Sequence, residues 1–122
     1  MAVIIRRVAL LSALEGAKNL YPNEFIALLR EEGGVITEIL LAPFSEYGPT
    51  FSSFQDFHLP PDPSIVGTFH SHPSPSNRPS RGDLQFFSRK GKIHLIAGIP
   101  FGIGDVKAYD NKGAETGIEV ID

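Results

Sequence analysis

Apolar residues in this chain occur in short runs separated by turn-forming residues, and this pattern most limits the folds open to it. The longest uncharged apolar stretch, residues 95–104, is about half the roughly 20 residues that a membrane-spanning helix needs. Short runs rich in β-branched residues are typical of strands. The 122 residues are also the length of one domain, so we expect a single domain over residues 1–122.

The first half of the chain predicts a strand, a helix and a hairpin. A short strand is expected over residues 2–5 and an amphipathic helix over residues 7–20. The apolar stripe of this helix is expected to comprise Val8, Leu11, Leu14, Ala17 and Leu20, and Tyr21-Pro22-Asn23 should end it.

Residues 24–30 and 35–41 are apolar runs on either side of Gly33-Gly34. This arrangement predicts a hairpin of buried strands. A helix over residues 24–32, capped by Asn23, is the alternative on local pattern alone.

The second half of the chain predicts a helix between strands. The expected elements are a strand over 65–70, a loop over 73–79, a helix over 80–88, strands over 92–99 and 105–109, a turn over 110–113 and a strand over 116–121. The order of elements predicts an α+β, or mixed α/β, domain with one sheet and helices packed on it.

Composition excludes several classes of protein. The net charge of −3 argues against a broad basic surface for nucleic acid. The chain has no cysteine, which excludes a disulfide scaffold, cysteine-ligated zinc and iron–sulfur clusters. Any metal must therefore be held by His, Asp or Glu. Arg6-Arg7 and the apolar residues after it resemble the start of a secretory signal, but Glu15 ends the run, so we expect a cytoplasmic protein that does not contact a membrane.

The chemistry-bearing residues gather in one segment, His70-Ser71-His72-Pro73 followed by Ser80 and Asp83. In a strand, residues i and i+2 face the same side, so His70 and His72 can present two imidazoles together. A loop over 73–79 could bring the start of the next helix, with Asp83, to face them. Two His and one Asp are a ligand set that catalytic zinc uses while leaving a fourth position to water.

Each of these residues also has a simpler interpretation. Two His at i and i+2 can arise by coincidence, and Ser80 with Asp83 matches a capping box at a helix start. A cap and a metal site are compatible, because the cap would also hold Asp83 in place. His58 and His94 lack such a context and are expected to be structural or surface residues.

A zinc hydrolase also needs a carboxylate as the base for its water. H-E-x-x-H is absent, so the base must lie elsewhere in the chain. Glu24 is one candidate because it precedes apolar residues that could raise its basicity. The pattern alone does not favour Glu24 over Glu38 or Glu46.

The joint pattern H-S-H-P-x6-S-x-x-D, with an upstream Glu in a P-x-E context, resembles the JAMM/MPN+ zinc metalloprotease family. The resemblance covers nearly the whole chain and implies an MPN-type domain with a curved mixed sheet flanked by helices. It implies one zinc per chain bound by His70, His72 and Asp83, with Glu24 as the base and Ser80 stabilising the oxyanion. The family often has Gly three residues after the catalytic Glu, where this chain has Ala27.

The resemblance also implies a substrate class. Active family members cleave isopeptide bonds after the Gly-Gly tail of ubiquitin or ubiquitin-like modifiers, and a small standalone domain is similar to prokaryotic and archaeal members. Alternatives are a zinc amidase acting on a sulfur-carrier adduct and a non-catalytic binding module. Residues 43–63, with five Pro and four Phe, are expected to cover the modifier tail or form a homodimer contact, or else to tuck their Phe rings into the core.

Overall fold

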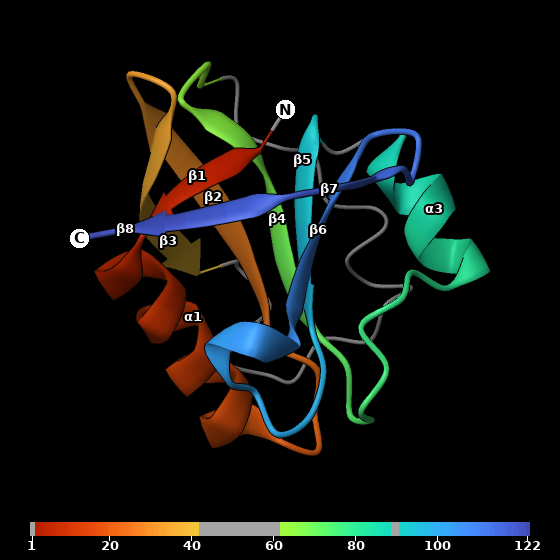
Figure 1. Cartoon of the computed structure of the whole chain (residues 1–122). Coiled ribbons are helices and arrows are strands. Elements are labelled where there is room, and N and C mark those ends of the chain that lie inside the picture. The colour runs from red at the N-terminus through yellow and green to blue at the C-terminus, as the bar shows by residue number, and fades with distance from the viewer. Residues whose placement is uncertain (1, 42–61, 89–90) are drawn as a thin grey trace.

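The structure, a computed structural model, describes residues 2–41, 62–88 and 91–122. Within these ranges, eight strands form one mixed sheet in the order β7-β6-β5-β4-β2-β3-β1-β8 (Figure 1). The strands are β1 (Val3–Arg6), β2 (Ile26–Glu32), β3 (Val35–Leu41), β4 (Ile65–Ser71), β5 (Ile93–Ala97), β6 (Val106–Asp110), β7 (Glu115–Thr116) and β8 (Ile118–Ile121). The helices are α1 (Arg7–Leu20), α3 (Arg81–Phe87) and the 3-10 turn η2 (Ile103–Asp105). The predicted mixed α/β class is confirmed.

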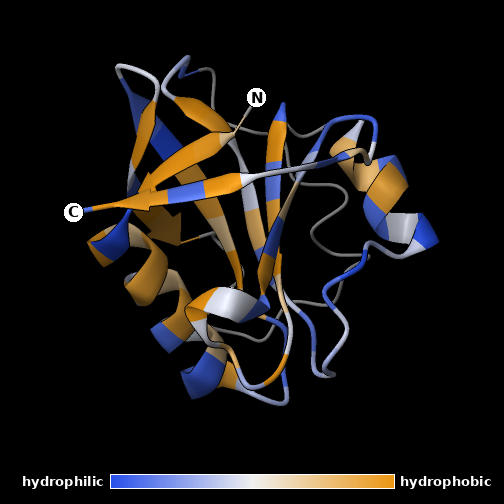
Figure 2. Cartoon of the chain, viewed as in Figure 1, coloured by the Kyte–Doolittle hydropathy of each residue, from blue (hydrophilic) through white to orange (hydrophobic). Residues whose placement is uncertain are grey.

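Two apolar clusters lie on opposite faces of the sheet. One cluster joins α1 to inward residues of the strands, including Phe69 and Leu95. The other joins Phe86 and Phe87 of α3 to the opposite face. Because side chains alternate along a strand, Phe69 faces α1 while the next residue, His70, contacts the two α3 rings. The strands are largely hydrophobic, whereas the loop between β4 and α3 is hydrophilic (Figure 2).

The predicted helix over residues 7–20 is confirmed, but its predicted apolar stripe is partly wrong. The residues that α1 buries against the sheet are Ala9, Leu10, Ala13, Leu14 and Ala17. Val8 and Leu11 are instead 68% and 46% exposed. Small alanines let the helix lie close to the sheet, so the buried face is set by Ala spacing as well as by the large apolar residues.

The predicted hairpin is confirmed, and the alternative helix over residues 24–32 is wrong. β2 and β3 pair antiparallel, with Glu32 opposite Val35. Gly33 and Gly34 have φ of 58° and 84°, the positive values that a two-residue hairpin turn requires. β2 is buried over its first four residues, which belong alternately to the two apolar clusters, whereas β3 is only partly buried.

The single strand predicted over residues 116–121 is wrong, because the structure divides it into β7 and β8. β7 pairs with β6 at one end of the sheet, and β8 pairs in parallel with β1 at the other end. Only Gly117 separates them, and its carbonyl accepts a hydrogen bond from the Val3 amide at 2.8 Å. One short segment therefore occupies both ends of the curved sheet (Figure 1).

The remaining predicted strands and the second helix are confirmed with small shifts of their ends. Of the stretch 43–63, all but the last two residues lie outside the described ranges, and so does His58. Within the described residues, no helix combines the length and the apolar character needed to cross a membrane.

His94 is a buried structural residue on β5. Its ring stacks on Phe87 with centroids 4.2 Å apart, Nδ1 lies 2.7 Å from the Thr68 hydroxyl, and Nε2 lies 3.1 Å from the Gly91 carbonyl. Burial lowers the pKa of His94 from 6.5 to about 4. The folded protein therefore holds this imidazole neutral at neutral pH.

We predict that His94 makes folding sensitive to mild acid. Below pH 6.5 the unfolded chain binds a proton that the folded chain binds only near pH 4, so stability falls as the pH drops through this window. The contribution is on the order of 3 kcal/mol. Urea unfolding of the wild type and of His94→Gln, carried out at several pH values from about 7.5 to about 4, measures this contribution to the free energy of unfolding. Parallel pH curves for the two proteins would contradict the prediction.

Candidate metal centre

The centre of the candidate site is the end of β4. β4 lies between β2 and β5, and all of its residues are buried. His70 is within the strand, opposite Ile26 and Ile96. His72 follows the strand directly and its amide donates to the Ala97 carbonyl at 2.9 Å, which extends the pairing with β5 by one residue. Two neighbouring strands thus fix the backbone that carries both imidazoles.

Asp83 reaches the site from the first turn of α3. The Ser80 hydroxyl accepts from the Asp83 amide at 3.1 Å, and the Ser80 amide donates to Asp83 Oδ2 at 2.8 Å. This reciprocal arrangement is the predicted capping box, which satisfies two backbone donors at the helix start. The cap also fixes the direction of the Asp83 carboxylate.

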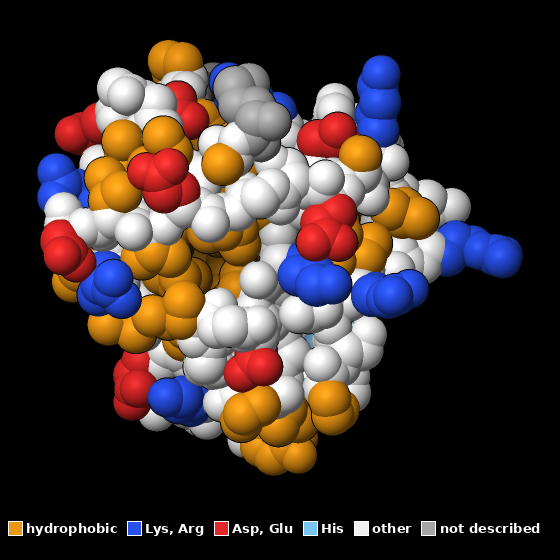
Figure 3. All heavy atoms as spheres, viewed as in Figure 1, with side chains coloured by type: hydrophobic (Ala, Val, Ile, Leu, Met, Phe, Trp, Pro, Cys, Tyr) orange, Lys and Arg blue, Asp and Glu red, His pale blue; other side chains and the backbone are white. Residues whose placement is uncertain are grey.

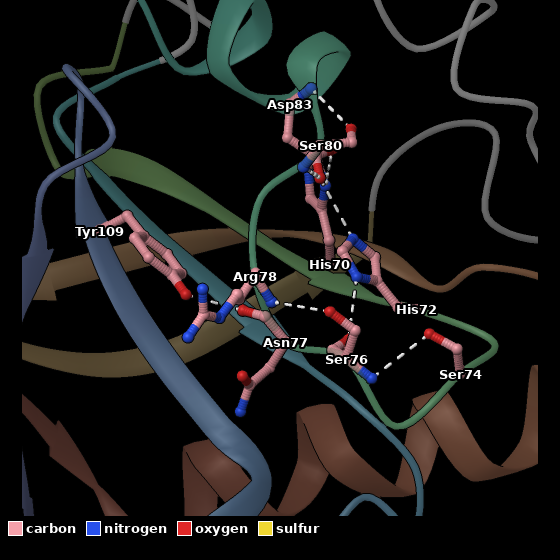
Figure 4. Close-up of polar contacts among 9 residues, drawn as sticks. All are labelled: His70, His72, Ser74, Ser76, Asn77, Arg78, Ser80, Asp83 and Tyr109. Atoms are coloured by element: carbon pink, nitrogen blue, oxygen red, sulfur yellow. Dashed lines mark hydrogen bonds and ion pairs between the residues drawn. The ribbon is translucent and has the colours of Figure 1, made fainter.

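The structure brings His70, His72 and Asp83 together, as Figure 4 shows. His72 Nε2 lies 3.2 Å from Asp83 Oδ2, and His70 Nδ1 lies 3.7 Å from Asp83 Oδ1. The side chains of these residues are 13%, 2% and 4% exposed, in the order His72, His70, Asp83. Almost no imidazole surface is visible on the face drawn in Figure 3.

Electrostatics in this cluster favour a charged carboxylate. Burial alone would raise the pKa of Asp83, but hydrogen bonds from His70, His72 and the Ser80 amide hold it far below its usual range. Burial also opposes a charge on His72, yet contact with Asp83 raises the pKa of this imidazole above 6.5. Asp83 therefore stays ionised and attracts a positive charge to His72.

Glu24 lies beside this cluster, just before β2. The preceding turn and the neighbouring Phe25 fix its position: the Phe25 amide donates to Ser71 Oγ at 2.7 Å, and the Phe25 carbonyl accepts from the Ser71 amide at 2.9 Å. Burial raises the pKa of the half-buried Glu24 carboxyl, while His70 and His72 lower it. A carboxylate with a raised pKa is a stronger base than an exposed one.

The other carboxylates considered as bases differ in their surroundings. Glu38 is on β3, where it forms an exposed ion pair with Arg30 at 3.3 Å. Glu46 lies outside the described residues. Among Glu24 and Glu38, it is Glu24 whose charge interacts with the two imidazoles and Asp83.

The donor set fits a zinc ion by its chemistry. His72 Nδ1 lies 3.1 Å from the Ser76 carbonyl, and a carbonyl only accepts, so Nδ1 carries a proton. In a neutral ring, the Nε2 lone pair then faces the Asp83 carboxylate at 3.2 Å, and two acceptors at this distance require a proton or a cation between them. Ligands bound to one tetrahedral zinc lie about 3.4 Å from each other, close to the contacts described above.

The side chains of the described residues are not arranged in the geometry of a bound metal ion. No group of three or more His, Cys, Asp or Glu side chains in residues 2–41, 62–88 and 91–122 is set out to hold an ion. The imidazoles contact the Asp83 carboxylate directly, and binding of a cation would replace these contacts.

The supporting roles of two residues were not predicted from the sequence. Ser71, between the two histidines, holds the Glu24 segment through its buried hydroxyl. Ser76, in the loop, orients His72 through a backbone carbonyl. The H-S-H spacing could have drawn attention to Ser71, but a backbone carbonyl carries no sequence signal.

Comparison with known proteins shows the family of this chain. Residues 6–112 match the family model described as prokaryotic homologs of the JAB domain. A curated relative from Haloferax volcanii, named a probable metalloprotease, is 36% identical, and the matched region covers 90% of this chain and 74% of that protein.

Solved structures are similar over the whole chain. A JAB1/MPN domain protein from Archaeoglobus fulgidus is 40% identical with a TM-score of 0.80, and full coverage of both chains. A structure described as JAMM, a metalloprotease-like zinc site in the proteasome and signalosome, is 37% identical with a TM-score of 0.79, again with full coverage of both. Protein DSY2949 from Desulfitobacterium hafniense, 21% identical with a TM-score of 0.65 over 98% of this chain and 92% of that one, shares the fold. This chain belongs to the prokaryotic JAB-domain family.

We predict that Ser71→Ala weakens the fold at the site. The substitution removes the acceptor of a buried backbone N–H, which costs about 1–3 kcal/mol in the free energy of unfolding. Ser71→Thr keeps a hydroxyl and should lose less. Urea unfolding of the three proteins measures the effect, and an alanine variant as stable as the wild type would refute it.

Proposed function

We propose that this chain is a zinc-dependent isopeptidase that hydrolyses the amide bond after the C-terminal Gly-Gly of a ubiquitin-like modifier. The observation that carries the proposal is the convergence of His70, His72 and Asp83 with a half-buried glutamate beside them. The name of the Haloferax relative and the zinc site attributed to the JAMM structure support hydrolysis with zinc. The substrate class rests on the motif resemblance described above.

His70, His72 and Asp83 would hold the zinc ion. Bound in such a set, zinc supplies Lewis acidity, which lowers the pKa of water and polarises a carbonyl. The Ser76 carbonyl and the Ser80 cap keep His72 and Asp83 directed toward the shared position. Outer contacts of this kind strengthen metal binding.

Glu24 acts first as the general base and then as the general acid in the proposed mechanism. Its carboxylate takes a proton from the attacking water as the water oxygen bonds to the amide carbon. The same carboxyl then gives that proton to the leaving amine when the carbon–nitrogen bond breaks. Its raised pKa suits both roles, because the group must accept and release a proton near neutral pH.

Ser80 supplies a hydrogen-bond donor for the carbonyl oxygen. Its oxygen already accepts from the Asp83 amide, so the hydroxyl proton is available for donation. Ser80 is exposed, and a substrate can reach it. A donor placed at a developing oxyanion stabilises the tetrahedral intermediate.

We expect the protein to act in the cytoplasm, and we propose that it forms a homodimer. The substrate is expected to enter as an extended tail ending in Gly-Gly. Glycines lack side chains, so a narrow channel leading to the site would admit them and exclude bulkier residues.

The proposal is tested by incubating the purified zinc-loaded chain with a ubiquitin-like protein joined through Gly-Gly to a lysine side chain. We predict release of the modifier, loss of cleavage with a chelator and recovery with added zinc. Cleavage of a cysteine conjugate but not of a lysine conjugate would indicate the amidase instead. Absence of cleavage of either by the zinc-loaded chain would indicate a binding module.

We predict that Glu24→Ala still binds about one zinc per chain and loses hydrolysis by roughly 10²–10⁴-fold, because a positioned acid–base group contributes this much. The matched control is Glu38→Ala, which removes an exposed carboxylate of an ion pair on β3. Zinc content by elemental analysis and the cleavage rate are measured for both. Full activity of the Glu24 variant would remove Glu24 from the mechanism.

A further inference from the structure

Tyr109, on β6, touches both segments that carry the candidate metal ligands. It is 4% exposed and belongs to the apolar cluster on the α3 side. Its ring lies at 26° to that of Phe87, with centroids 6.1 Å apart, so it packs against the helix that carries Asp83. Its hydroxyl donates to the Asn77 carbonyl at 2.8 Å, in the loop that follows His72.

Asn77 joins the same loop to the last residue of η2, directly before β6. Its side-chain amide donates to the Asp105 carbonyl at 3.0 Å. Together with the bond from Tyr109, this gives Asn77 one contact through its backbone and one through its side chain. Figure 4 shows Asn77 between Tyr109 and Ser76.

The loop is also fixed farther upstream. The Ile99 amide donates to the Ser74 carbonyl at 2.9 Å. The loop backbone at Pro75 approaches Gly98 so closely that a Cβ on Gly98 would lie 2.5 Å from the Pro75 carbonyl oxygen. The loop between the two ligand-bearing segments is therefore held on both sides of Ser76.

Ser76 is the residue through which this anchoring reaches the site. Its carbonyl lies 3.1 Å from His72 Nδ1, while Nε2 of the same ring lies 3.2 Å from the Asp83 carboxylate. A ring held at one nitrogen presents the other in a fixed direction. A shift of Asn77 would move the adjacent carbonyl and turn the imidazole.

We propose that Tyr109 and Asn77 are positioning residues that hold the Ser76 carbonyl against His72 and so keep its Nε2 directed at the metal position. This inference rests on the proposed zinc site and assigns to it two residues outside the H-S-H-P-x6-S-x-x-D motif. Neither residue touches substrate or metal; each acts through the loop.

The test compares wild type, Tyr109→Phe and Asn77→Ala, with Tyr21→Phe as the matched loss of an exposed tyrosine hydroxyl. Zinc affinity is measured by competition with a chromophoric chelator, and the visible spectrum of the cobalt-substituted protein reports ligand geometry. We expect both site variants to bind zinc at least about tenfold more weakly, with an altered cobalt spectrum, while Tyr21→Phe behaves as wild type. Thermal unfolding is recorded for each protein.

A second readout needs no metal. In the metal-free protein, NMR measures how fast the His72 Nδ1 proton exchanges with water. Exchange should be at least about tenfold faster in Tyr109→Phe, because the Ser76 carbonyl no longer holds that proton in place. If the wild type binds no zinc, the proposed function fails and this exchange rate decides the inference by itself. Wild-type exchange and affinity in Tyr109→Phe would overturn it, whatever the change in thermal stability.

Discussion

The site depends on one buried carboxylate, that of Asp83. It closes the capping box of α3 and contacts both imidazoles at the end of β4. A buried carboxylate is costly unless an opposite charge and hydrogen bonds compensate it. Here the compensation comes from His70, His72 and the Ser80 amide. The contacts that would bind a cation are therefore also the contacts that dock the helix on the sheet.

The rest of the fold keeps this arrangement rigid. β4 is buried on both faces, because α1 covers one cluster and α3 the other. The pairing of β4 with β2 continues to Phe25, the residue after Glu24. The pairing of β4 with β5 continues to His72. His70 thus lies within β4, His72 one residue beyond it, and Asp83 in the first turn of α3. Side chains carried on strands and helices are held more precisely than side chains on loops.

Much of this could be predicted from the sequence, because the signals were local. The hairpin followed from Gly33-Gly34 between two apolar runs, and the capping box followed from the spacing of Ser80 and Asp83. The errors came from tertiary context. Val8 and Leu11 suit a buried stripe, yet the alanines of α1 set the face that packs. The role of the Ser76 carbonyl had no signal, because a backbone group leaves no trace in residue type.

The segment 115–121, which forms β7 and β8, has a consequence for how the chain folds during its synthesis. Both ends of the sheet, at β6 and at β1, receive their outermost partner from these residues. β1 is synthesised long before its partner β8, because the two strands are far apart in the chain. Until that segment emerges, the nascent chain exposes two strand edges at once, and such edges invite pairing with other chains. The sheet is therefore completed, and both of its edges are covered, only once residues 115–121 have emerged.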